Sequence, residues 1–524
     1  MKLYLKTLTP VHIGTGKEVE KFEYIIKNNQ FCRINFSKLS ELLFDKFPEK
    51  FSEWINKISS EENVTNELNI DNIKRQISGN TKIDLEINKS IQYKLNSNGK
   101  PNNKVRECIK SGSNELFIPG SSIKGSIRTA FLSNALTRTD ESFKSKLIDN
   151  ITSQIQTAQR IPRDREKIKK SICDFVESEI FYCGVKTTKN GIESENFNDE
   201  KFDLMKLISI SDSSSLKSEE YGEICNMTMY KLRNTRGRTL INSECISKYS
   251  LFNIDISIDK NFILKAKELL EKKDDNFGKK DWIKFKEKFE RLFNLNLIAL
   301  NSNNIESLLL DSILNSINKF GKEVYDREGM WINSLNGNVD SQYIKNFYSN
   351  PEFLNSFKVG YGSGFSAATI FLWMNNVNNL RLQIEKVAKF FGIGKHRNGT
   401  DVNITEFPFT RKYDINNNEI SPLGWIEISR KEFPIPTTEN TININVEKPK
   451  IVKKDGWVEA ELVQISKKPY KIKILEGDLK DFELNFQYGN LEGLKVGKRL
   501  YVTITVNKKQ RLDSKPDFMG FIEE

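Results

Sequence analysis

The stretch FIPGSSIKGSIRTAF, residues 117–131, predicts the end of a β-strand followed directly by a helix. Two apolar residues run into Pro119-Gly120, a dipeptide typical of a tight turn after a strand. Ser121 or Ser122 is then the expected helix cap. One face of the helix is apolar at the spacing of helical turns: Ile123, Ile127, Ala130 and Phe131. We expect this face to be buried.

The start of the same helix is a candidate anion site. Lys124 and Arg128 are four residues apart, so they lie on one face beside N–H groups that have no helical partner. The helix dipole, the free amides and the two cations favour a phosphate, and small residues such as Gly125 allow close approach. An ordinary capped helix with two solvated charges explains the same residues, and both interpretations stay open at this point.

A nucleotide-binding P-loop is excluded. Gly120 and Gly125 have the P-loop separation, but Ser126 stands where the motif G-x-x-x-x-G-K-[ST] requires lysine. The segment GTGKE at 14–18 fails as well, because Glu18 replaces the required serine or threonine and no glycine lies five residues before Gly16. Hydrolysis of nucleoside triphosphates is therefore not supported.

The composition indicates a globular protein with a basic surface. Its 524 residues suffice for two to four domains, and 81 Lys and Arg against 70 Asp and Glu give a net charge of +11. Such a balance is compatible with a polyanionic partner. The first residues lack the apolar core of a signal peptide, and no stretch of about 18 apolar residues occurs, so we expect a cytoplasmic location.

Cysteine and histidine are too sparse for common metal centres. The six cysteines form no C-x-x-C pair, and the chain has two histidines, His12 and His396. A structural zinc site needs closely spaced thiolates or imidazoles, so we expect reduced thiols and neither a metal nor another cofactor. A catalytic triad would have to use one of the two histidines.

The order of patterns predicts an α+β chain with helical insertions and a separate β tail. Residues 2–9 alternate as a strand, Pro10 to Gly16 form a turn, and a second strand lies near 23–26. Residues 260–320 are helical by period and propensity. The expected parts are an N-terminal portion, 1–135, with a helical insertion at about 36–105, a second portion, 136–430, a linker, 431–455, and a small barrel, 456–524.

Two further segments stand out, one by its positive charge, which suits contact with a nucleic-acid backbone, and one by its glycines. A basic turn between β segments carries Arg233, Arg236 and Arg238, although an ordinary charged hairpin is a slightly better explanation. In the segment KVGYGSGF the three glycines are Gly360, Gly362 and Gly364. Their spacing is a weak dinucleotide signal, and close approach of backbone explains it well.

The tail contains five short alternating runs between Gly, Lys and Asp turns, a pattern typical of a small barrel of the OB kind. Its aromatic residues Trp457, Tyr470, Phe482 and Tyr501 are candidates for stacking on single-stranded nucleic acid. We favour a place in the barrel core for most of them.

Four segments together resemble the RAMP superfamily of CRISPR-associated proteins: LTPVHIGTG, FIPGSSIKGSIRTAF, VGYGSGF and FPFTRKY with SPLGW. Their order is most similar to the fifth-subunit family of type III-A (Csm) effector complexes, and a strand ending in Asp-Ser, FDLMKLISISDSS, strengthens the likeness. The resemblance covers about residues 1–430. It implies ferredoxin-like, RNA-recognition-type domains, whereas the tail has no counterpart in the pattern.

The resemblance also implies a function. Members of this kind bind guide RNA near its 3′ end, cap the backbone filament beside a neighbouring RAMP subunit, and support guide maturation in antiviral defence. Target RNA is a further partner that stays open, and no membrane is involved. The family's RNA-binding positions match Gly14 and Gly16, the three late glycines, and a set in the opening stretch: Ser121, Ser122, Lys124, Gly125 and Arg128.

Two enzyme hypotheses and one structural hypothesis stand beside the binding function. A metal-independent endoribonuclease would use His12 as acid or base, although a structural imidazole is the better explanation. Cleavage of target RNA with a divalent ion would use Asp203 or Asp212, but neither has a second carboxylate at suitable spacing. A purely structural assembly protein predicts salt-insensitive RNA association. We expect a non-catalytic RNA-binding subunit.

Overall fold

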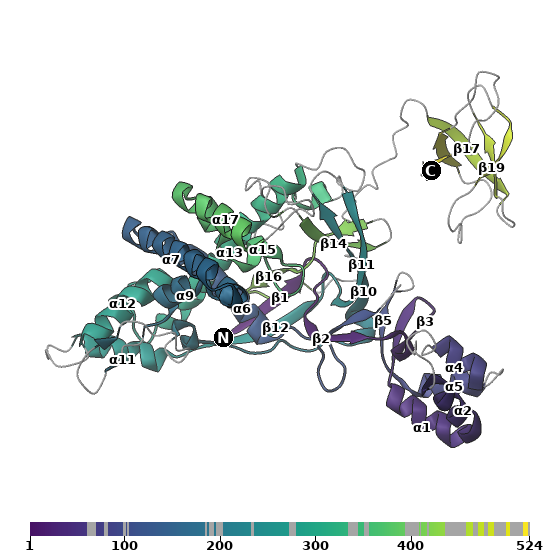
Figure 1. Ribbon diagram of the computed structural model, residues 1–524, viewed down its shortest axis with the longest axis horizontal. Helices are drawn as coiled ribbons and strands as arrows, with labels where there is room; N and C mark the ends of the chain where they lie inside the picture. The colour runs from purple at the N-terminus through teal and green to yellow at the C-terminus, as the bar shows by residue number, and fades with distance from the viewer. Residues whose placement is uncertain are drawn as a thin grey trace. The chain divides into compact units, whose positions relative to one another are not determined.

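The computed structural model divides the chain into two units, Met1–Phe433 and Pro434–Glu524. The residues it describes are 1–59, 70–77, 82–97, 101, 104–183, 186–187, 193–194, 203–231, 235–271, 279–333, 344–349, 356–392, 408, 410–416, 419–434, 457–464, 470–475, 480–486, 499–503 and 517–521. The protein is a mixed α and β structure, as predicted, with helices packed against curled sheets (Figure 1).

The first sheet of the large unit joins the two ends of that unit. Its strands lie in the order β13 (Ser356–Lys358), β16 (Trp425–Ser429), β1 (Lys2–Thr7), β12 (Leu251–Ile258) and β9 (Ile208–Ile210). Neighbours are antiparallel, with Leu3 opposite Ile254 and Leu5 opposite Phe252 and Ile428. Leu3 and Leu5 are fully buried, because alternate residues of β1 point into the core.

The second sheet has nine strands. Its main order is β2 (Gly14–Val19), β6 (Val105–Cys108), β11 (Thr235–Ile246), β10 (Gly222–Lys231), β5 (Ile91–Asn96), β4 (Gln30–Ile34) and β3 (Tyr24–Lys27), and β14 (Thr410–Asn416) pairs with β10 and with β15 (Glu419–Ser421). Both sheets combine strands from before and after residue 135. The boundary expected at residue 135 therefore divides the sequence, but strands from both sides of it pair within the same sheets.

Helices cover the sheets on one side of the large unit. They are α6 (Gly120–Leu136), α7 (Glu141–Arg160), α8 (Arg165–Ser171), α9 (Asp174–Phe181), α10 (Ser218–Tyr221), α11 (Lys260–Glu271), α12 (Lys279–Phe293), α13 (Ile305–Asn333), α15 (Gly364–Ala368), α16 (Phe371–Asn375) and α17 (Asn378–Phe391). Helix α6 packs against α13, α12 and β9, and its predicted apolar face is buried, which confirms the periodicity. The predicted helices of 260–320 are confirmed as α11, α12 and α13.

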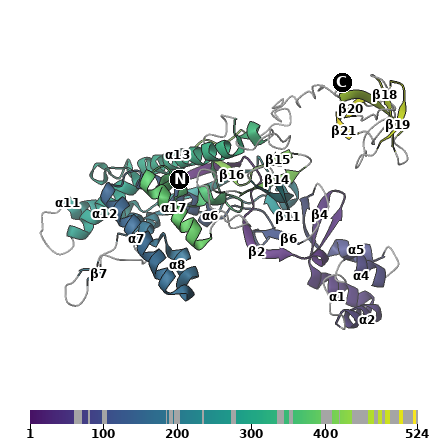
Figure 2. The same ribbon diagram turned by 45° about the horizontal axis from the view of Figure 1, so that its top comes forward.

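The insertion after β4 forms a small helical body of its own. It contains α1 (Phe36–Lys46), α2 (Pro48–Ser59), α4 (Ile70–Ile77) and α5 (Lys82–Lys89), which share a core that includes Leu39, Leu43, Trp54 and Ile73. Figures 1 and 2 both show it beside β3 to β5, at the opposite end of the large unit from α11. The range expected for the insertion, about 36–105, contains these helices and also β5 and the start of β6.

The small unit contains the five predicted tail strands. They are β17 (Trp457–Gln464), β18 (Tyr470–Ile474), β19 (Glu483–Phe486), β20 (Arg499–Thr503) and β21 (Asp517–Phe521), in the antiparallel order β19-β18-β17-β20-β21. Of the four aromatic candidates for stacking, Phe482 is 59% exposed. The side chains of Trp457, Tyr470 and Tyr501, and most of the expected linker, lie outside the described residues.

Three local expectations were wrong. The residues between Leu116 and α6 form no strand. Leu116 makes only isolated β-bridges, and the Ile118 N–H donates to the hydroxyl of Ser213, which follows β9. Gly14 to Gly16 begin strand β2 instead of closing a turn, although an irregularity in the pairing between Gly14 and Glu18 distorts it. Neither Ser121 nor Ser122 caps α6, because the helix begins at Gly120 after Pro119.

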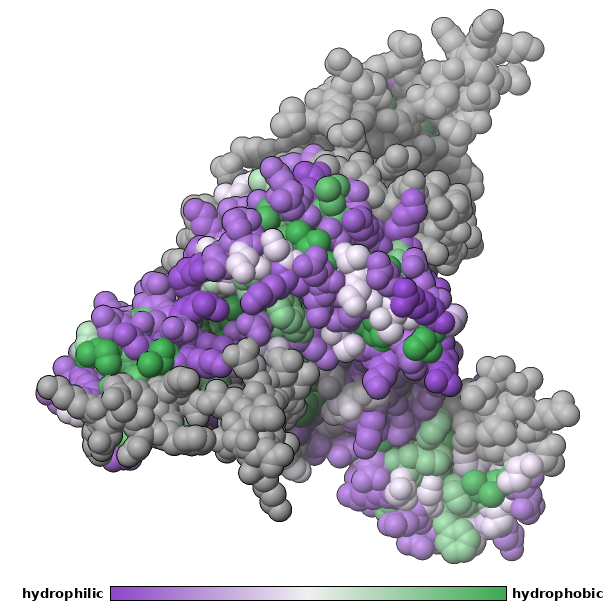
Figure 3. All heavy atoms as spheres, turned by 60° about the vertical axis from the view of Figure 1, so that its left-hand side comes forward, coloured by the Kyte–Doolittle hydropathy of each residue, from purple (hydrophilic) through white to green (hydrophobic). Residues whose placement is uncertain are grey.

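The surface seen in Figure 3 is mainly hydrophilic, with hydrophobic residues in small separate groups. Within the described ranges, no helix combines the length and apolar character needed to cross a bilayer.

Candidate nucleic-acid interface

The start of α6 is fixed by the end of β9. A Cβ atom placed on Gly120 would lie 2.3 Å from the carbonyl oxygen of Ile210, so only glycine allows this contact. The Gly120 N–H donates to Oδ1 of Asp212 at 2.8 Å, and the Ile118 N–H donates to Oγ of Ser213 at 2.9 Å. Asp212 therefore caps the start of α6 from a distant part of the sequence.

The two cations of α6 have different environments. The Arg128 guanidinium forms ion pairs with Glu177 of α9 and with Asp203, and it lies 3.7 Å from the centre of the Phe181 ring. Asp203 also accepts the Met205 N–H at 2.8 Å. Arg128 and Asp203 thus tie α6 to its neighbours, and the charge of Arg128 is matched by two carboxylates.

Lys124, in contrast, forms no ion pair among the residues that the structure describes. Burial lowers its pKa, and the nearby Arg128 and Lys206 lower it further, against the opposing effect of Asp203. Beside it, Ser121 and Gly125 are exposed, and no atom lies within 4 Å of the position of a Gly125 Cβ. The first turns of α6 therefore present one uncompensated cation on an open surface of small residues.

The late glycines meet the first strand. The Tyr361 N–H donates to the His12 carbonyl at 2.8 Å, and a Cβ on Gly360 would lie 2.4 Å from that same oxygen. Gly360, Gly362 and Gly364 all have positive φ, at 73°, 89° and 81°. The explanation of these glycines by close backbone approach is confirmed at Gly360.

Helix α6 adjoins this meeting point. The Ser126 hydroxyl donates to the carbonyl of Lys358, two residues before Gly360, at 2.9 Å. These bonds link residues that directly flank or belong to three segments distant in sequence: 14–16, which follows His12, 121–125, which precedes Ser126, and 360–364, which contains Tyr361 and follows Lys358. We call them together the glycine surface.

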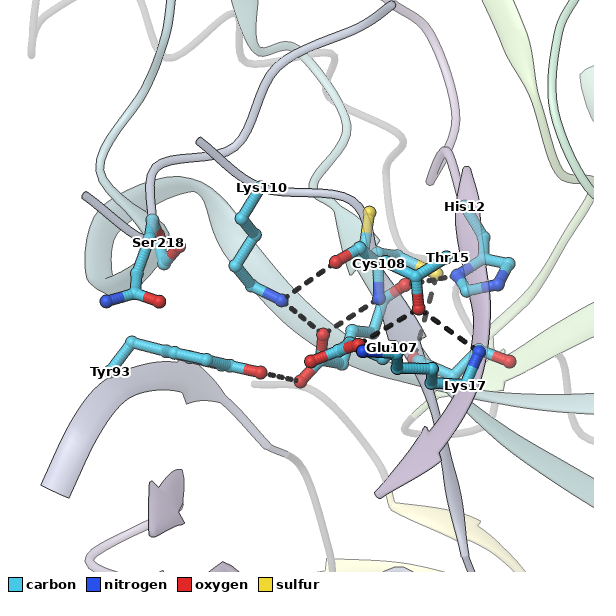
Figure 4. A network of polar contacts seen from close by, with 12 residues as sticks. His12, Thr15, Lys17, Tyr93, Glu107, Cys108, Lys110 and Ser218 are labelled. Carbon is cyan, nitrogen blue, oxygen red and sulfur yellow. Dashed lines mark hydrogen bonds and ion pairs between the residues drawn. The ribbon is translucent and has the colours of Figure 1, made fainter. Parts of the chain in front are cut away.

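His12 belongs to a network of polar contacts around β2 and β6 (Figure 4). Its Nδ1 donates to the backbone carbonyl of Glu244 at 2.6 Å, so the neutral ring carries its proton on Nδ1. The carboxylate of Glu244 accepts from Tyr93 Oη at 2.7 Å and from the Cys108 N–H at 2.9 Å, and pairs with Lys110. Burial lowers the pKa of His12, despite the hydrogen bond to Glu244. The side chain of His12 is 2% exposed.

Sequence reasoning missed three residues at the edge of this network. Arg106 of β6 and Lys412 of β14 both lie against the Tyr361 ring, at 4.6 Å and 4.0 Å from its centre, and the ring meets His12 edge-on at 5.8 Å. In the sequence, Lys412 is simply one residue of the segment FPFTRKY, and no local pattern marks Arg106. The residues lie too far apart for any spacing rule to relate them.

The remaining candidates stay predictions. Arg233 and His396 lie outside the described residues, and for Arg236 and Arg238 the structure gives their place in β11 but not their side chains.

Comparisons with known proteins agree with the resemblance. The model of the RAMP superfamily matches residues 4–398, so the chain belongs to that superfamily. It is 26% identical over 441 residues to the CRISPR system Cms protein Csm5 of Methanocaldococcus jannaschii, covering 82% of this chain and 89% of the relative. To the Csm5 of Streptococcus thermophilus it is 31% identical over 142 residues, which is 25% of this chain and 37% of that relative.

Among solved structures, the fold is similar to one chain of a cryo-EM structure of a type III-A Csm-crRNA-target RNA ternary complex. The TM-score is 0.53 at 21% identity, with 82% of this chain and all of the other chain covered.

Proposed function

We propose that the protein is a non-catalytic subunit of a type III-A Csm effector complex. In this function it binds guide RNA near its 3′ end, caps the backbone filament next to a neighbouring RAMP subunit, and supports guide maturation in antiviral defence in the cytoplasm. Membership of the RAMP superfamily and the likeness to Csm5 proteins support the proposal.

The observation that carries it is the glycine surface. Strand β2, helix α6 and the late glycine loop are far apart in the sequence. A backbone hydrogen bond nevertheless links the loop to His12, just before β2, and the Ser126 hydroxyl of α6 bonds to Lys358, just before the loop. An RNA backbone needs a surface of small residues and amides with positive charge nearby. Ser121, Gly125 and Lys124 provide these, so binding is expected to depend little on base sequence.

The proposal includes a finer description of the fold. We assign the sheets of the large unit to ferredoxin-like, RNA-recognition-type domains and the five-stranded small unit to an OB-like barrel. The alternating burial of Ala460 and Leu462 between half-exposed neighbours in β17 supports a sheet with one inner face.

A catalytic role for His12 has little structural support. The ring is buried and its Nδ1 proton is committed to Glu244, so a ribose 2′-hydroxyl has no access to the imidazole. Asp203 and Asp212 are each occupied by hydrogen bonds within the fold.

The test is to purify the chain with its co-expressed partners and to sequence the bound RNA. Separately, the isolated chain is incubated with guide precursor and Mg²⁺. Guide RNA retained in the complex, without cleavage by the isolated chain, supports the proposal. A complex that assembles without RNA contact to this subunit, judged by crosslinking, or cleavage that His12→Ala abolishes, contradicts it.

A matched pair of variants tests the surface itself. Lys124→Ala is expected to weaken RNA binding about threefold to tenfold, because one phosphate contact is lost. Lys265→Ala on α11 removes the same charge from an exposed i,i+3 pair with Glu268 and should leave binding unchanged.

A further inference from the structure

Two cations converge on one tyrosine at the edge of the glycine surface. The Arg106 guanidinium and the Lys412 ammonium both lie within 5 Å of the centre of the Tyr361 ring, and Lys412 Nζ donates to the Tyr361 hydroxyl at 2.5 Å. The three residues come from β6, from β14 and from the late glycine loop, and all are half-buried.

Neither cation is neutralised. Within the part of the chain that the structure describes, Arg106 and Lys412 form no ion pair. The carboxyl groups on the same or adjoining strands have other partners. Glu107 accepts from the Thr15 hydroxyl at 2.9 Å, Glu244 is paired with Lys110, and Asp414 accepts the Asn226 N–H at 2.7 Å.

Glu18 lies directly opposite Arg106 in the pairing of β2 with β6, but it is exposed and forms no ion pair with Arg106 among the described contacts. Two like charges beside one ring repel each other, and an anion that contacts both would remove that cost.

The tyrosine hydroxyl completes a set of donors. Because the Tyr361 oxygen accepts from Lys412, its own proton is available to a further acceptor. Guanidinium, ammonium and phenol protons together match the oxygens of a phosphodiester, and guanidinium binds such oxygens in a bidentate manner.

We propose that Arg106, Lys412 and the Tyr361 hydroxyl bind one phosphodiester group of single-stranded RNA. This inference rests on the proposed function and adds a second positively charged group beside that of Lys124. The His12 ring meets the Tyr361 ring edge-on, and a base stacked on Tyr361 is the competing explanation that the variants below separate.

The test measures binding of a fluorescein-labelled uridine 20-mer by anisotropy over a range of salt concentrations. The double variant Arg106→Gln/Lys412→Gln is expected to lose affinity about tenfold, and the slope of log affinity against log salt should fall in magnitude by about one. Tyr361→Phe removes the hydroxyl alone, so it should lower affinity about threefold and leave the slope unchanged.

The control is Lys260→Gln/Lys265→Gln on α11. It makes the same change in net charge by removing two exposed lysines that pair with Glu306 and Glu268, and it should bind as the parent does. Melting temperatures of all variants establish that each is folded. If the double glutamine variant does not fold, Arg106→Lys/Lys412→Arg takes its place and should retain the parental slope while losing affinity through altered geometry.

The outcomes separate the two proposals. A parent chain that binds RNA, with a folded double variant of equal affinity and equal slope, overturns the phosphate site and leaves the proposed function standing. A parent chain that does not bind RNA overturns both. Loss of binding in Tyr361→Ala, with a normal slope in the double variant, indicates base stacking and also overturns the phosphate site.

Discussion

The backbone N–H of Tyr361 donates to the carbonyl of His12, 2.8 Å away, and this bond links the late glycine loop to the segment that precedes β2. The contact brings backbone against backbone at Gly360. It therefore depends on the absence of a side chain there, and it sets the relative position of β2 and the loop that carries Tyr361.

Gly360→Ala is expected to destabilise the large unit. The new methyl would lie 2.4 Å from the His12 oxygen, at a φ of 73° that residues with a Cβ rarely adopt. We expect a loss of at least about 1 kcal/mol in the free energy of unfolding, measured by thermal or urea denaturation. Gly125→Ala is the control, because it lies in α6 with open space around it, and it should be neutral or stabilising.

Arg128→Ala should harm the fold, whereas Lys124→Ala should not. Removing the guanidinium leaves Asp203 and Glu177 without their partner, at a cost of about 1–3 kcal/mol. The two variants are compared by melting temperature and by RNA anisotropy. Equal melting temperatures for both would show that the ion pairs of Arg128 contribute nothing to stability.

His12→Gln is expected to reduce the acid sensitivity of the protein. The folded pKa of His12 is below its unfolded value, so the unfolded chain binds the proton more readily. The stability that follows is present above about pH 6.5 and is lost as pH falls toward the folded pKa. Melting curves between pH 5 and pH 8 should show a smaller loss on acidification in the variant, and a parental slope in the variant would contradict this.

Asp414→Asn should act in the opposite direction. Burial raises the pKa of Asp414 to about 7, with Glu223 contributing, so the folded state retains a proton that the unfolded state releases. This contribution to stability is present at low pH and is lost as pH rises from about 4 to 7. The asparagine variant should therefore gain stability relative to the parent between pH 5 and pH 8. The exposed Asp255→Asn serves as the control and should keep the parental dependence.

Local patterns predicted the elements well where the signal is short-range. The apolar period of α6, the helices of 260–320 and the five tail strands all follow from spacing and turn residues. The cap of α6 did not, because Asp212 lies 92 residues from Gly120 and no local rule relates them.

The candidate site shows the same limit. Lys124 and Arg128 are equivalent by helical spacing, but only the tertiary structure brings Glu177 and Asp203 to Arg128. Similarly, the meeting of Arg106, Tyr361 and Lys412 depends on how strands pair across the second sheet, which the sequence of each segment does not encode.

Strand β1 lies between β12 and β16, and Tyr4 pairs with Ser429. During synthesis, β1 leaves the ribosome long before β16, so it waits for almost the whole large unit before its second neighbour exists. The insertion formed by α1 to α5 has its own core, which is built from residues close together in the sequence. It is therefore expected to become compact early. The first strand must be kept from pairing with other chains in the meantime, and its lysines at positions 2 and 6 are of the kind that discourage such association.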